Sequence, residues 1–169
     1  MKRLSGKCAV VTGASRGIGL ALARALAAEG CQLALCSRSV ESVQTAFPDL
    51  RDTDLASACD VRDEDSVRIF FEAVRDRFGR LDILINNAGH AHPMVNVEAL
   101  ALSLWRDTLD TNLTGTFLCT RAALPLMAPG AAVVNNLSVA AVQAFARESA
   151  WSSRNMLPQA TGKSSSLHM

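Results

Sequence analysis

The sequence has no tyrosine among its 169 residues, so it offers no phenol that could donate or accept a proton. It also has no apolar run long enough to cross a bilayer. Lysine and arginine total 17 against 16 acidic residues, which leaves a formal net charge of +1. Because neither a basic excess nor a block of like charge is present, we expect no nucleic-acid partner and no membrane partner.

The N-terminus is also short of apolar residues. Residues 1–7 begin with basic side chains, as a secretion signal does, but only the apolar residues 8–11 follow before Thr12 and Gly13. That stretch is too short for a signal core and predicts a first strand instead. The cysteines are odd in number and form no Cys-x-x-Cys pair, which favours small buried thiols in a reducing cytoplasm. They are Cys8, Cys31, Cys36, Cys59 and Cys119.

Strand-like and helix-like segments alternate through residues 1–150, and this alternation predicts an α/β domain with a parallel sheet and crossover helices. Strands are expected at residues 7–11, 32–36, 55–59, 81–85 and 131–137. Helices are expected from residue 17, at 40–48, at 63–78 and, as one long helical region, at about 97–127. Right-handed crossovers would give the doubly wound strand order 3-2-1-4-5.

Local signals support these helices. Ile18, Leu22 and Leu26 recur at helical spacing in the first one. Acidic residues at 63–65 suit the positive start of the third helix. Its apolar stripe consists of Val67, Phe70, Phe71, Val74 and Phe78. The Pro-Gly pair at 129–130 is expected to break the long helical region before the fifth strand.

Residues 151–169 differ in texture from the rest of the chain. They are rich in serine and show no sustained helical or strand periodicity. We therefore expect one domain at residues 1–150, followed by a divergent tail at 151–169 that is disordered or loosely attached.

A glycine-rich turn joins the first strand to the first helix at residues 12–19, with the sequence Thr-Gly-Ala-Ser-Arg-Gly-Ile-Gly. Gly13 permits a tight turn, Gly17 lets the backbone approach a pyrophosphate, and Gly19 lets helix and strand pack closely. The amides at the start of the helix would then face the phosphates. A tight turn without any ligand is the alternative for this segment taken alone.

A second motif, Asn-Asn-Ala-Gly at residues 86–89, ends the fourth strand. Together the two segments resemble the fingerprints of the short-chain dehydrogenase/reductase family, and the resemblance extends through Asp60-Val61, Asn112 and residues 133–138. It covers about residues 4–150, with the motifs in family order and at family spacing. It implies a Rossmann-type doubly wound parallel sheet, incomplete here, and an oxidoreductase that transfers hydride between a dinucleotide and a ketone or alcohol.

Charge at the end of the second strand bears on the choice of cofactor. An NAD site usually carries an acid there, and that acid would repel a 2′-phosphate. Here Cys36-Ser37-Arg38 contains no carboxylate. The resemblance places Arg16 and Arg38 at the adenosine end, where two guanidinium groups suit a dianion. We expect NADP(H), with NAD(H) as the weaker alternative, although two solvated surface arginines would also account for the pattern.

The resemblance also assigns cofactor contacts. Asp60 would bond the adenine amino group with Val61 beside the ring, although Asp60 could instead cap the following helix. Asn87, Ala88 and Gly89 would form the floor under the nicotinamide ribose, although strand-end turn chemistry also accounts for them. The implied cofactor-binding set is Gly13, Ser15, Arg16, Gly17, Ile18, Gly19, Arg38, Asp60, Val61, Asn87, Ala88 and Gly89.

Of the catalytic set that the resemblance implies, Ser138 and Asn112 are present. Ser138 would bond the substrate carbonyl and Asn112 would support a water relay; the alternatives are an idle strand-end hydroxyl and a helix-kink residue. The family's tyrosine and lysine are missing, because Trp151 and Asn155 stand at their places. An indole is too weak an acid and an amide carries no charge, so we expect little or no reductase activity.

His90 and His92 could serve as two ligands of a metal site, but no pattern of acidic residues or cysteines completes such a site, so we expect no metal. A loop near the substrate entrance, or simple exposure, accounts for them better.

The chain also ends earlier than the resemblance leads us to expect. That would leave the fifth strand as an open edge with an apolar face. The resemblance also implies that homo-oligomers pair through the long fourth helix and the next one, which is missing here, so half of that interface would be absent. A reading-frame shift near Trp151 would account for the early end, because the possible codons of residues 154–162 allow another frame to read Lys-His-Ala-Ala-Ala-Gly-Asp-Trp. The gene's nucleotide sequence decides this. We expect an NADP(H)-dependent oxidoreductase by family in a truncated, inactive form; the alternatives are a non-catalytic dinucleotide-binding or regulatory protein and an unfolded product without a role.

Overall fold

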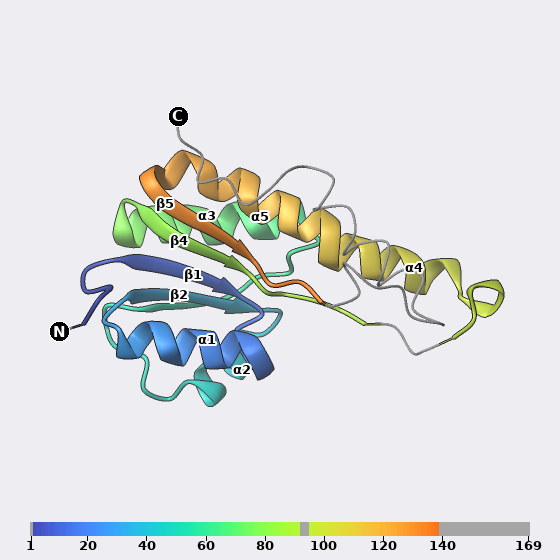
Figure 1. The fold of residues 1–169 in the computed structure, drawn as a ribbon, viewed down its shortest axis with the longest axis horizontal. Helices are drawn as coiled ribbons and strands as arrows, with labels where there is room; N and C mark the ends of the chain where they lie inside the picture. The colour runs from blue at the N-terminus through green and yellow to red at the C-terminus, as the bar shows by residue number, and fades with distance from the viewer. Residues whose placement is uncertain (1, 92–94, 139–169) are drawn as a thin grey trace.

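The computed structural model describes residues 2–91 and 95–138. Its centre is a five-stranded parallel sheet in the order β3-β2-β1-β4-β5, which confirms the expected doubly wound order (Figure 1). The strands are β1 (Cys8–Thr12), β2 (Gln32–Ser37), β3 (Leu55–Ala58), β4 (Leu81–Asn86) and β5 (Met127–Asn135). The expected tail at 151–169 lies outside the described residues.

Helices cover both faces of this sheet, with α1 and α2 on one face and α3 and α5 on the other (Figure 1). The helices are α1 (Gly17–Ala28), α2 (Val40–Ala46), α3 (Glu64–Phe78), α4 (Leu102–Leu109) and α5 (Gly115–Ala123). Alternate residues of β1 serve the two cores: Ala9 and Val11 belong to the cluster beneath α1 and α2, whereas Cys8 and Val10 belong to the one beneath α3 and α5. A strand that is covered on both faces is nearly all apolar, and β1 is apolar from Cys8 to Val11.

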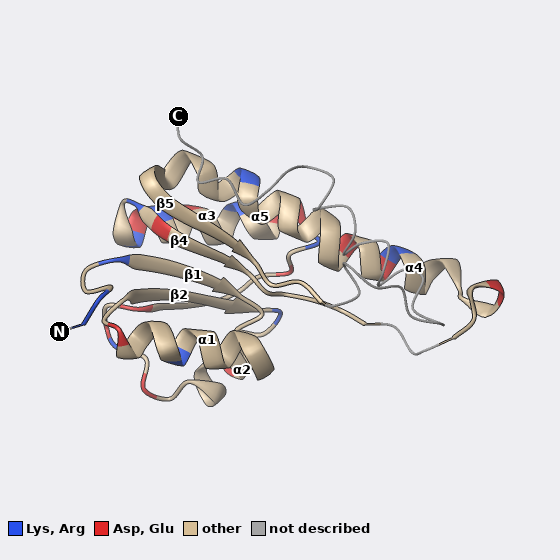
Figure 2. Ribbon diagram, in the orientation of Figure 1, with Lys and Arg blue, Asp and Glu red and all other residues tan. Residues whose placement is uncertain are grey.

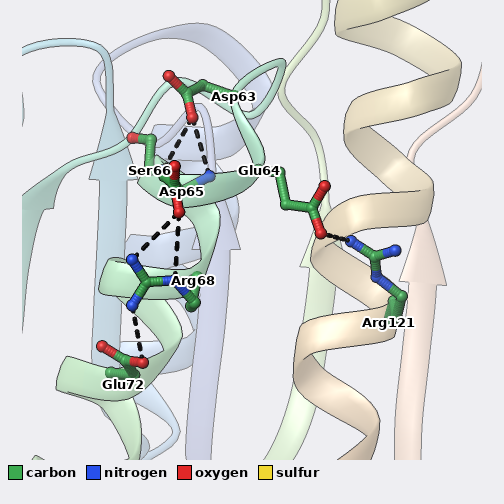
Figure 3. Close-up of polar contacts among 7 residues, drawn as sticks. All are labelled: Asp63, Glu64, Asp65, Ser66, Arg68, Glu72 and Arg121. Carbon is green, nitrogen blue, oxygen red and sulfur yellow. Dashed lines mark hydrogen bonds and ion pairs between the residues drawn. The ribbon is translucent and has the colours of Figure 1, made fainter.

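α3 shows how local sequence builds these elements. The Asp63 carboxylate caps the helix by accepting hydrogen bonds from the amides of Asp65 and Ser66, at 2.9 and 3.1 Å (Figure 3). Gly79 ends the helix with a φ of +69°, which favours glycine. The expected apolar stripe faces the sheet, and four of its five residues are buried while Phe78 is partly buried.

The long helical region expected at about 97–127 is confirmed, but it consists of several segments of different helix type. A 3-10 turn (Val97–Ala99) precedes α4, a π-helical segment (Asp110–Thr114) separates α4 from α5, and a second 3-10 turn (Leu124–Leu126) follows. β5 begins at Met127, so the Pro-Gly pair at 129–130 lies inside the strand rather than before it. An outer strand tolerates proline where pairing is irregular, and the register between β4 and β5 shifts in this stretch.

Ile18 departs from the expected apolar stripe of α1. Its side chain is 61% exposed, whereas Leu22 and Leu26 pack against the core. Ile18 lies in the first turn of the helix, beyond the last residue of β1, where the sheet no longer covers it. Helical spacing alone does not reveal where the opposing sheet ends.

All five cysteines are buried and free, which confirms the expected burial. Burial raises the pKa of the Cys8 and Cys119 thiols to about 12, so both stay protonated at neutral pH. No helix in the described part of the chain is both long and apolar enough to pass through a bilayer. Acidic and basic residues are interspersed over the ribbon (Figure 2).

The Asp54 carboxylate fastens the loop before β3 to β2. Its Oδ1 accepts a hydrogen bond from the Leu33 amide at 2.9 Å, and its Oδ2 accepts one from the Arg51 amide at 3.0 Å. The Arg51 guanidinium lies 2.7 Å away, and the Asp54 side chain is 1% exposed. Although burial acts to raise the pKa of Asp54, the hydrogen bonds from the Arg51 side chain and from both amides hold that pKa below its ordinary value.

We predict that Asp54→Asn lowers the free energy of unfolding at pH 7 by about 1–3 kcal/mol, because a buried charged acceptor is lost. A carboxyl whose pKa is lower in the folded state stabilises the protein above its unfolded pKa, and this stabilisation disappears as the pH falls through the folded pKa. The variant should therefore lose less stability than the wild type between about pH 5 and pH 2. Urea unfolding followed by circular dichroism measures both effects.

The matched control is Asp52→Asn, which changes an exposed carboxyl in the same loop. It should leave the stability and its pH dependence unchanged. Equal pH profiles for Asp54→Asn and Asp52→Asn would contradict the role given to Asp54.

Candidate functional site

The candidate site lies at the carboxyl edge of the sheet. β1 is flanked by β2 and β4, and the helices that follow β1 and β4 run to opposite faces (Figure 1). In open α/β sheets this reversal leaves a crevice at the carboxyl ends of the strands, where ligands bind. Both sequence motifs, at residues 12–19 and 86–89, lie at this point.

The glycine-rich turn adopts the conformation that its glycines permit. Gly13 has a φ of +65°, and a Cβ there would come within 2.9 Å of Ala88 Cα. A Cβ on Gly19 would collide with the carbonyl oxygen of Gly13 and with the Asn87 amide, so helix and strand approach closely as expected. Gly17 has a φ of +56°, and nothing lies within 4 Å of the place where its Cβ would be. The turn is therefore tight toward the protein and open toward solvent.

A threonine hydroxyl ties the turn after β1 to the segment after β4. Thr12 Oγ1 accepts hydrogen bonds from the amides of Asn87 and Ala88, each at 3.0 Å, and donates to the Ile85 carbonyl at 3.4 Å. In return, Asn87 Nδ2 donates to the carbonyls of Thr12 and Gly13, at 2.9 and 3.2 Å. We call Thr12, Asn87 and Ala88 the strand-end bridge. It joins the two motifs into one structure.

Asparagines after the neighbouring strands extend this bridge. Asn136 Nδ2 donates to Asn87 Oδ1 at 2.9 Å. Asn86 Nδ2 donates to Asn135 Oδ1 at 2.9 Å and to Thr120 Oγ1 at 3.0 Å. Within the described part of the chain, Asn86 Oδ1 is buried without a hydrogen-bond partner. These bonds hold the ends of β4 and β5 to each other and to α5.

The start of α1 is open to an anion. No side chain caps this helix, and the Ala14 amide donates to the Cys36 carbonyl at 3.0 Å, which sets the turn beside the end of β2. Arg16 and Arg38 are both exposed, and neither guanidinium forms a hydrogen bond or an ion pair with another described residue. Ser15, in the same turn, is half-buried. Positive charge and free amides therefore border the same turn.

The two residues that follow β3, Asp60 and Val61, make different kinds of contact. Asp60 does not cap α3, because Asp63 does; instead its carboxylate pairs with Arg62, whose Nη2 lies 2.7 Å from Asp60 Oδ2. Val61 is 6% exposed, and it packs so closely on Gly115 that a Cβ there would lie 2.7 Å from Val61 Cγ2. The Val61 side chain therefore belongs to the core, and a contact with an adenine ring would fall to its backbone.

Asn112 lies in the π-helical segment and holds the loop after β4. Its Oδ1 accepts from the His90 amide and its Nδ2 donates to the His90 carbonyl, both at 2.7 Å. Thr116 Oγ1 donates to the Asn112 carbonyl at 2.8 Å. π-Helical turns are rare and often mark functional sites. The position accords with both interpretations of Asn112, a residue of a distorted helix and a residue of the site.

Ser138 is half-buried and follows β5. Because Asn86 pairs with Asn135, Ser138 and Gly89 stand equally far beyond their strands. The register thus brings Ser138 to the edge of the sheet that carries the second motif.

Three residues of the sequence-based hypotheses, Trp151, Asn155 and His92, lie outside the described residues, so the expectations about them stay predictions. Across residues 2–91 and 95–138, no three histidine, cysteine or acidic side chains are placed to hold a metal ion.

Sequence reasoning missed three residues of the site: Thr12 as a hydrogen-bond centre, Asn136 and Arg62. Thr12 belongs to the first motif, so the motif itself carried the signal. Arg62 stands two residues after Asp60, but this spacing does not show that its side chain folds back onto the carboxylate. Asn136 lies in the motif at residues 133–138, but its contact with Asn87 spans 49 positions of the chain and no local pattern predicts it.

The sequence matches the family described as short chain dehydrogenase over residues 7–154. D-threitol dehydrogenase from Mycolicibacterium smegmatis is 43% identical over 148 residues, which cover 85% of this chain and 56% of that protein. 3beta-hydroxysteroid dehydrogenase from Mediterraneibacter gnavus is 35% identical over 155 residues, covering 89% of this chain and 56% of that protein. The chain spans about half the length of the curated relatives it matches.

A solved structure from Sinorhizobium meliloti 1021, of a protein assigned as a short-chain alcohol dehydrogenase, is also similar. Its TM-score is 0.86 at 34% sequence identity, over 94% of this chain and 64% of that one. Sequence and structure therefore point to the same group of proteins.

We predict that Thr12→Val destabilises the protein by about 2–4 kcal/mol. Valine has nearly the same shape but cannot accept the Asn87 and Ala88 amides, and each buried donor left unsatisfied costs about 1–3 kcal/mol. Thr12→Ser keeps the hydroxyl and is the control, with a loss below about 1.5 kcal/mol from the missing methyl group. Urea unfolding measures both. Equal losses for the two variants would show that packing, and not the hydroxyl, matters at this position.

Proposed function

This chain belongs to the short-chain dehydrogenase family, and on that premise we propose that it binds NADP(H) at the carboxyl edge of its sheet without acting as a reductase. The observation that carries the proposal is the uncapped start of α1, bordered by two exposed arginines that pair with no other described residue and by Cys36-Ser37-Arg38, which contains no acid. The family consists of oxidoreductases, and the preference for NADP(H) and the lack of activity are the parts that we propose.

The residues of the site fit a dinucleotide. The open space at Gly17 would be filled by any side chain, so glycine leaves room for a pyrophosphate against the helix start. The strand-end bridge fixes the turn and the Asn87-Ala88-Gly89 segment relative to each other, and these would support the nicotinamide ribose. Ser15 and Ile18, at the mouth of the turn, would contact the same ligand.

The preference for the 2′-phosphate is supported by charge. Among the described residues, neither Arg16 nor Arg38 forms an ion pair with a carboxylate, so both guanidinium groups are available to a phosphate dianion. An acid in their place would favour the ribose hydroxyls of NAD(H) and repel the phosphate. NAD(H) is therefore the weaker ligand in this proposal.

The chain lacks the proton donor that the chemical step of the family needs. When bound, the cofactor supplies hydride to a ketone or accepts it from an alcohol. Ser138 would bond the substrate oxygen, and Asn112 would hold the loop of His90 in place beside it. No tyrosine exists to protonate that oxygen, and Trp151 and Asn155 stand at the places of the family's tyrosine and lysine. Loss of a proton donor lowers rates by about 10²–10⁴.

The names of the relatives bear on the substrate of the family reaction. The relatives are named for a small polyol and for a steroid, which differ so much in size and polarity that we propose only a ketone or alcohol for the family reaction. Phe117 and Leu124 expose 57% and 51% of their surface on α5 and the turn that follows it, which supports pairing of two chains through this helix. The buried free cysteines support a cytoplasmic location.

Two candidate functions share this proposal: an oxidoreductase by family whose present form is inactive, and a non-catalytic dinucleotide-binding or regulatory protein. The intact site for phosphates and the lack of tyrosine favour the second, and cofactor binding without turnover would support it.

We predict that NADPH binds at least about tenfold more tightly than NADH, a difference of about 1.4 kcal/mol. Arg38→Ala should weaken NADPH binding by about an order of magnitude and leave NADH binding nearly unchanged, because only the 2′-phosphate contact is lost. NADPH fluorescence titration measures both constants. Arg77→Ala is the control, since it removes one exposed charge at the far end of α3. NADH binding that equals or exceeds NADPH binding would refute the preference.

We further predict that the purified chain does not reduce a panel of ketones and aldehydes above a control with cofactor alone. A folded sample with bound NADPH is required, and a cooperative thermal melt establishes the fold. Consumption of NADPH in step with formation of an alcohol would contradict the proposed inactivity while leaving the family assignment intact.

A further inference from the structure

The carboxylate of Asp60 lies just after β3 and accepts hydrogen bonds from one neighbouring residue, Arg62. Oδ1 accepts the Arg62 amide at 3.0 Å and the Arg62 Nε at 3.0 Å. Oδ2 accepts Nη2 at 2.7 Å and shares the Nε hydrogen at 3.2 Å. The two side chains are 32% and 37% exposed, so the pair lies at the surface of the edge and is open to a ligand.

The donors to the Asp60 carboxylate among the described residues leave one of its lone-pair positions free. A carboxylate offers about four lone-pair positions, and Arg62 brings three hydrogens to Asp60, from its amide, Nε and Nη2. Both positions of Oδ1 are taken, and the closer contact of Nε is with Oδ1. The remaining position belongs to Oδ2. A ligand at this edge therefore meets an acceptor of fixed direction that has no proton to donate.

Neighbouring charges keep this group ionised. The hydrogen bond from the Arg62 side chain is the main reason that the pKa of Asp60 lies below its ordinary value, and the positive charge of Arg38 acts in the same direction. Arg62 itself has a second partner, Asp107 of α4, whose Oδ1 lies 3.5 Å from Nη1. That contact is long and its Asp107 side chain is 51% exposed, so it contributes little to the grip on Asp60.

We propose that Arg62 is a specificity-determining positioning residue, which holds the Asp60 carboxylate so that its open Oδ2 position selects a purine base with an exocyclic amino group. The inference rests on the proposed function, in which Arg16 and Arg38 bind the adenosine end of NADP(H), and on the family resemblance, which implies that the adenine amino group lies beside Asp60. An amino group donates to the open position of Oδ2. An oxo group at the same place would set two oxygens against each other with no hydrogen between them.

The test compares NADPH with its hypoxanthine analogue, nicotinamide hypoxanthine dinucleotide phosphate, in which the 6-amino group is replaced by an oxo group. Wild-type protein should bind NADPH at least about tenfold more tightly, as expected for a hydrogen bond to a charged acceptor. Arg62→Met should lose most of this discrimination by weakening NADPH binding, because the released carboxylate can turn away. Arg62→Lys should lose part of it, since an ammonium group keeps the charge but not the two-pronged grip.

Two controls separate positioning from general effects. Asp107→Asn removes the other partner of Arg62 and should leave the discrimination at its wild-type value. Arg68→Met removes an arginine that pairs with Asp65 and Glu72 on the outer face of α3 (Figure 3), and it should change neither constant.

The outcomes distinguish this inference from the proposed function. If wild-type protein binds NADPH but does not discriminate against the analogue, or if Arg62→Met weakens both ligands equally, the positioning role is overturned and the cofactor assignment stands. If folded wild-type protein binds neither ligand, the proposed function itself fails. Thermal melts of both Arg62 variants verify the fold, and Arg62→Lys decides the matter if Arg62→Met does not fold.

Discussion

The rest of the site depends on one hydroxyl, Thr12 Oγ1, and on the two amides that it accepts. The amides of Asn87 and Ala88 lie about 75 positions further along the chain, yet each is 3.0 Å from this oxygen. The bridge sets the distance between the glycine-rich turn and the segment after β4, so both walls of the crevice are fixed before any ligand arrives. Such preorganisation lowers the entropic cost of binding.

In the function that we propose, the bridge lies between an adenosine end and a nicotinamide end of the site, and these two ends differ in character. At the adenosine end, positive charge is plentiful: Arg16 and Arg38 have no partners among the described residues, and Arg62 orients Asp60. At the nicotinamide end, Asn112 secures the loop of His90, but no phenol is present in the chain to move a proton. We therefore propose that cofactor binding and the chemical step are separable in this protein, because each would depend on residues from a different part of the fold.

The sequence predicted the parts of the structure that local rules control. The positions of Gly13 and Gly19 predicted the tight turn. A Cβ at either position would collide with Ala88 or Asn87, so only glycine fits there. Strand order followed from the right-handed crossover rule. The interpretation of Asn112 as a helix-kink residue anticipated a distortion, but its π-helical form could not be predicted, because it accompanies hydrogen bonds between Asn112 and the distant loop of His90. Arg62 was overlooked because only the coordinates show that its side chain folds back onto Asp60.

The central claim is that the bridged turn and its arginines form a site for a phosphorylated dinucleotide. Isothermal titration of the folded chain with oxidised NADP⁺ tests it most directly, because this ligand carries every phosphate and involves no hydride donation. The account predicts saturable binding of one NADP⁺ per chain, weakened by added salt because the contacts are ionic. A chain that melts cooperatively but gives no binding heat and no NADP⁺-dependent rise in melting temperature would contradict it.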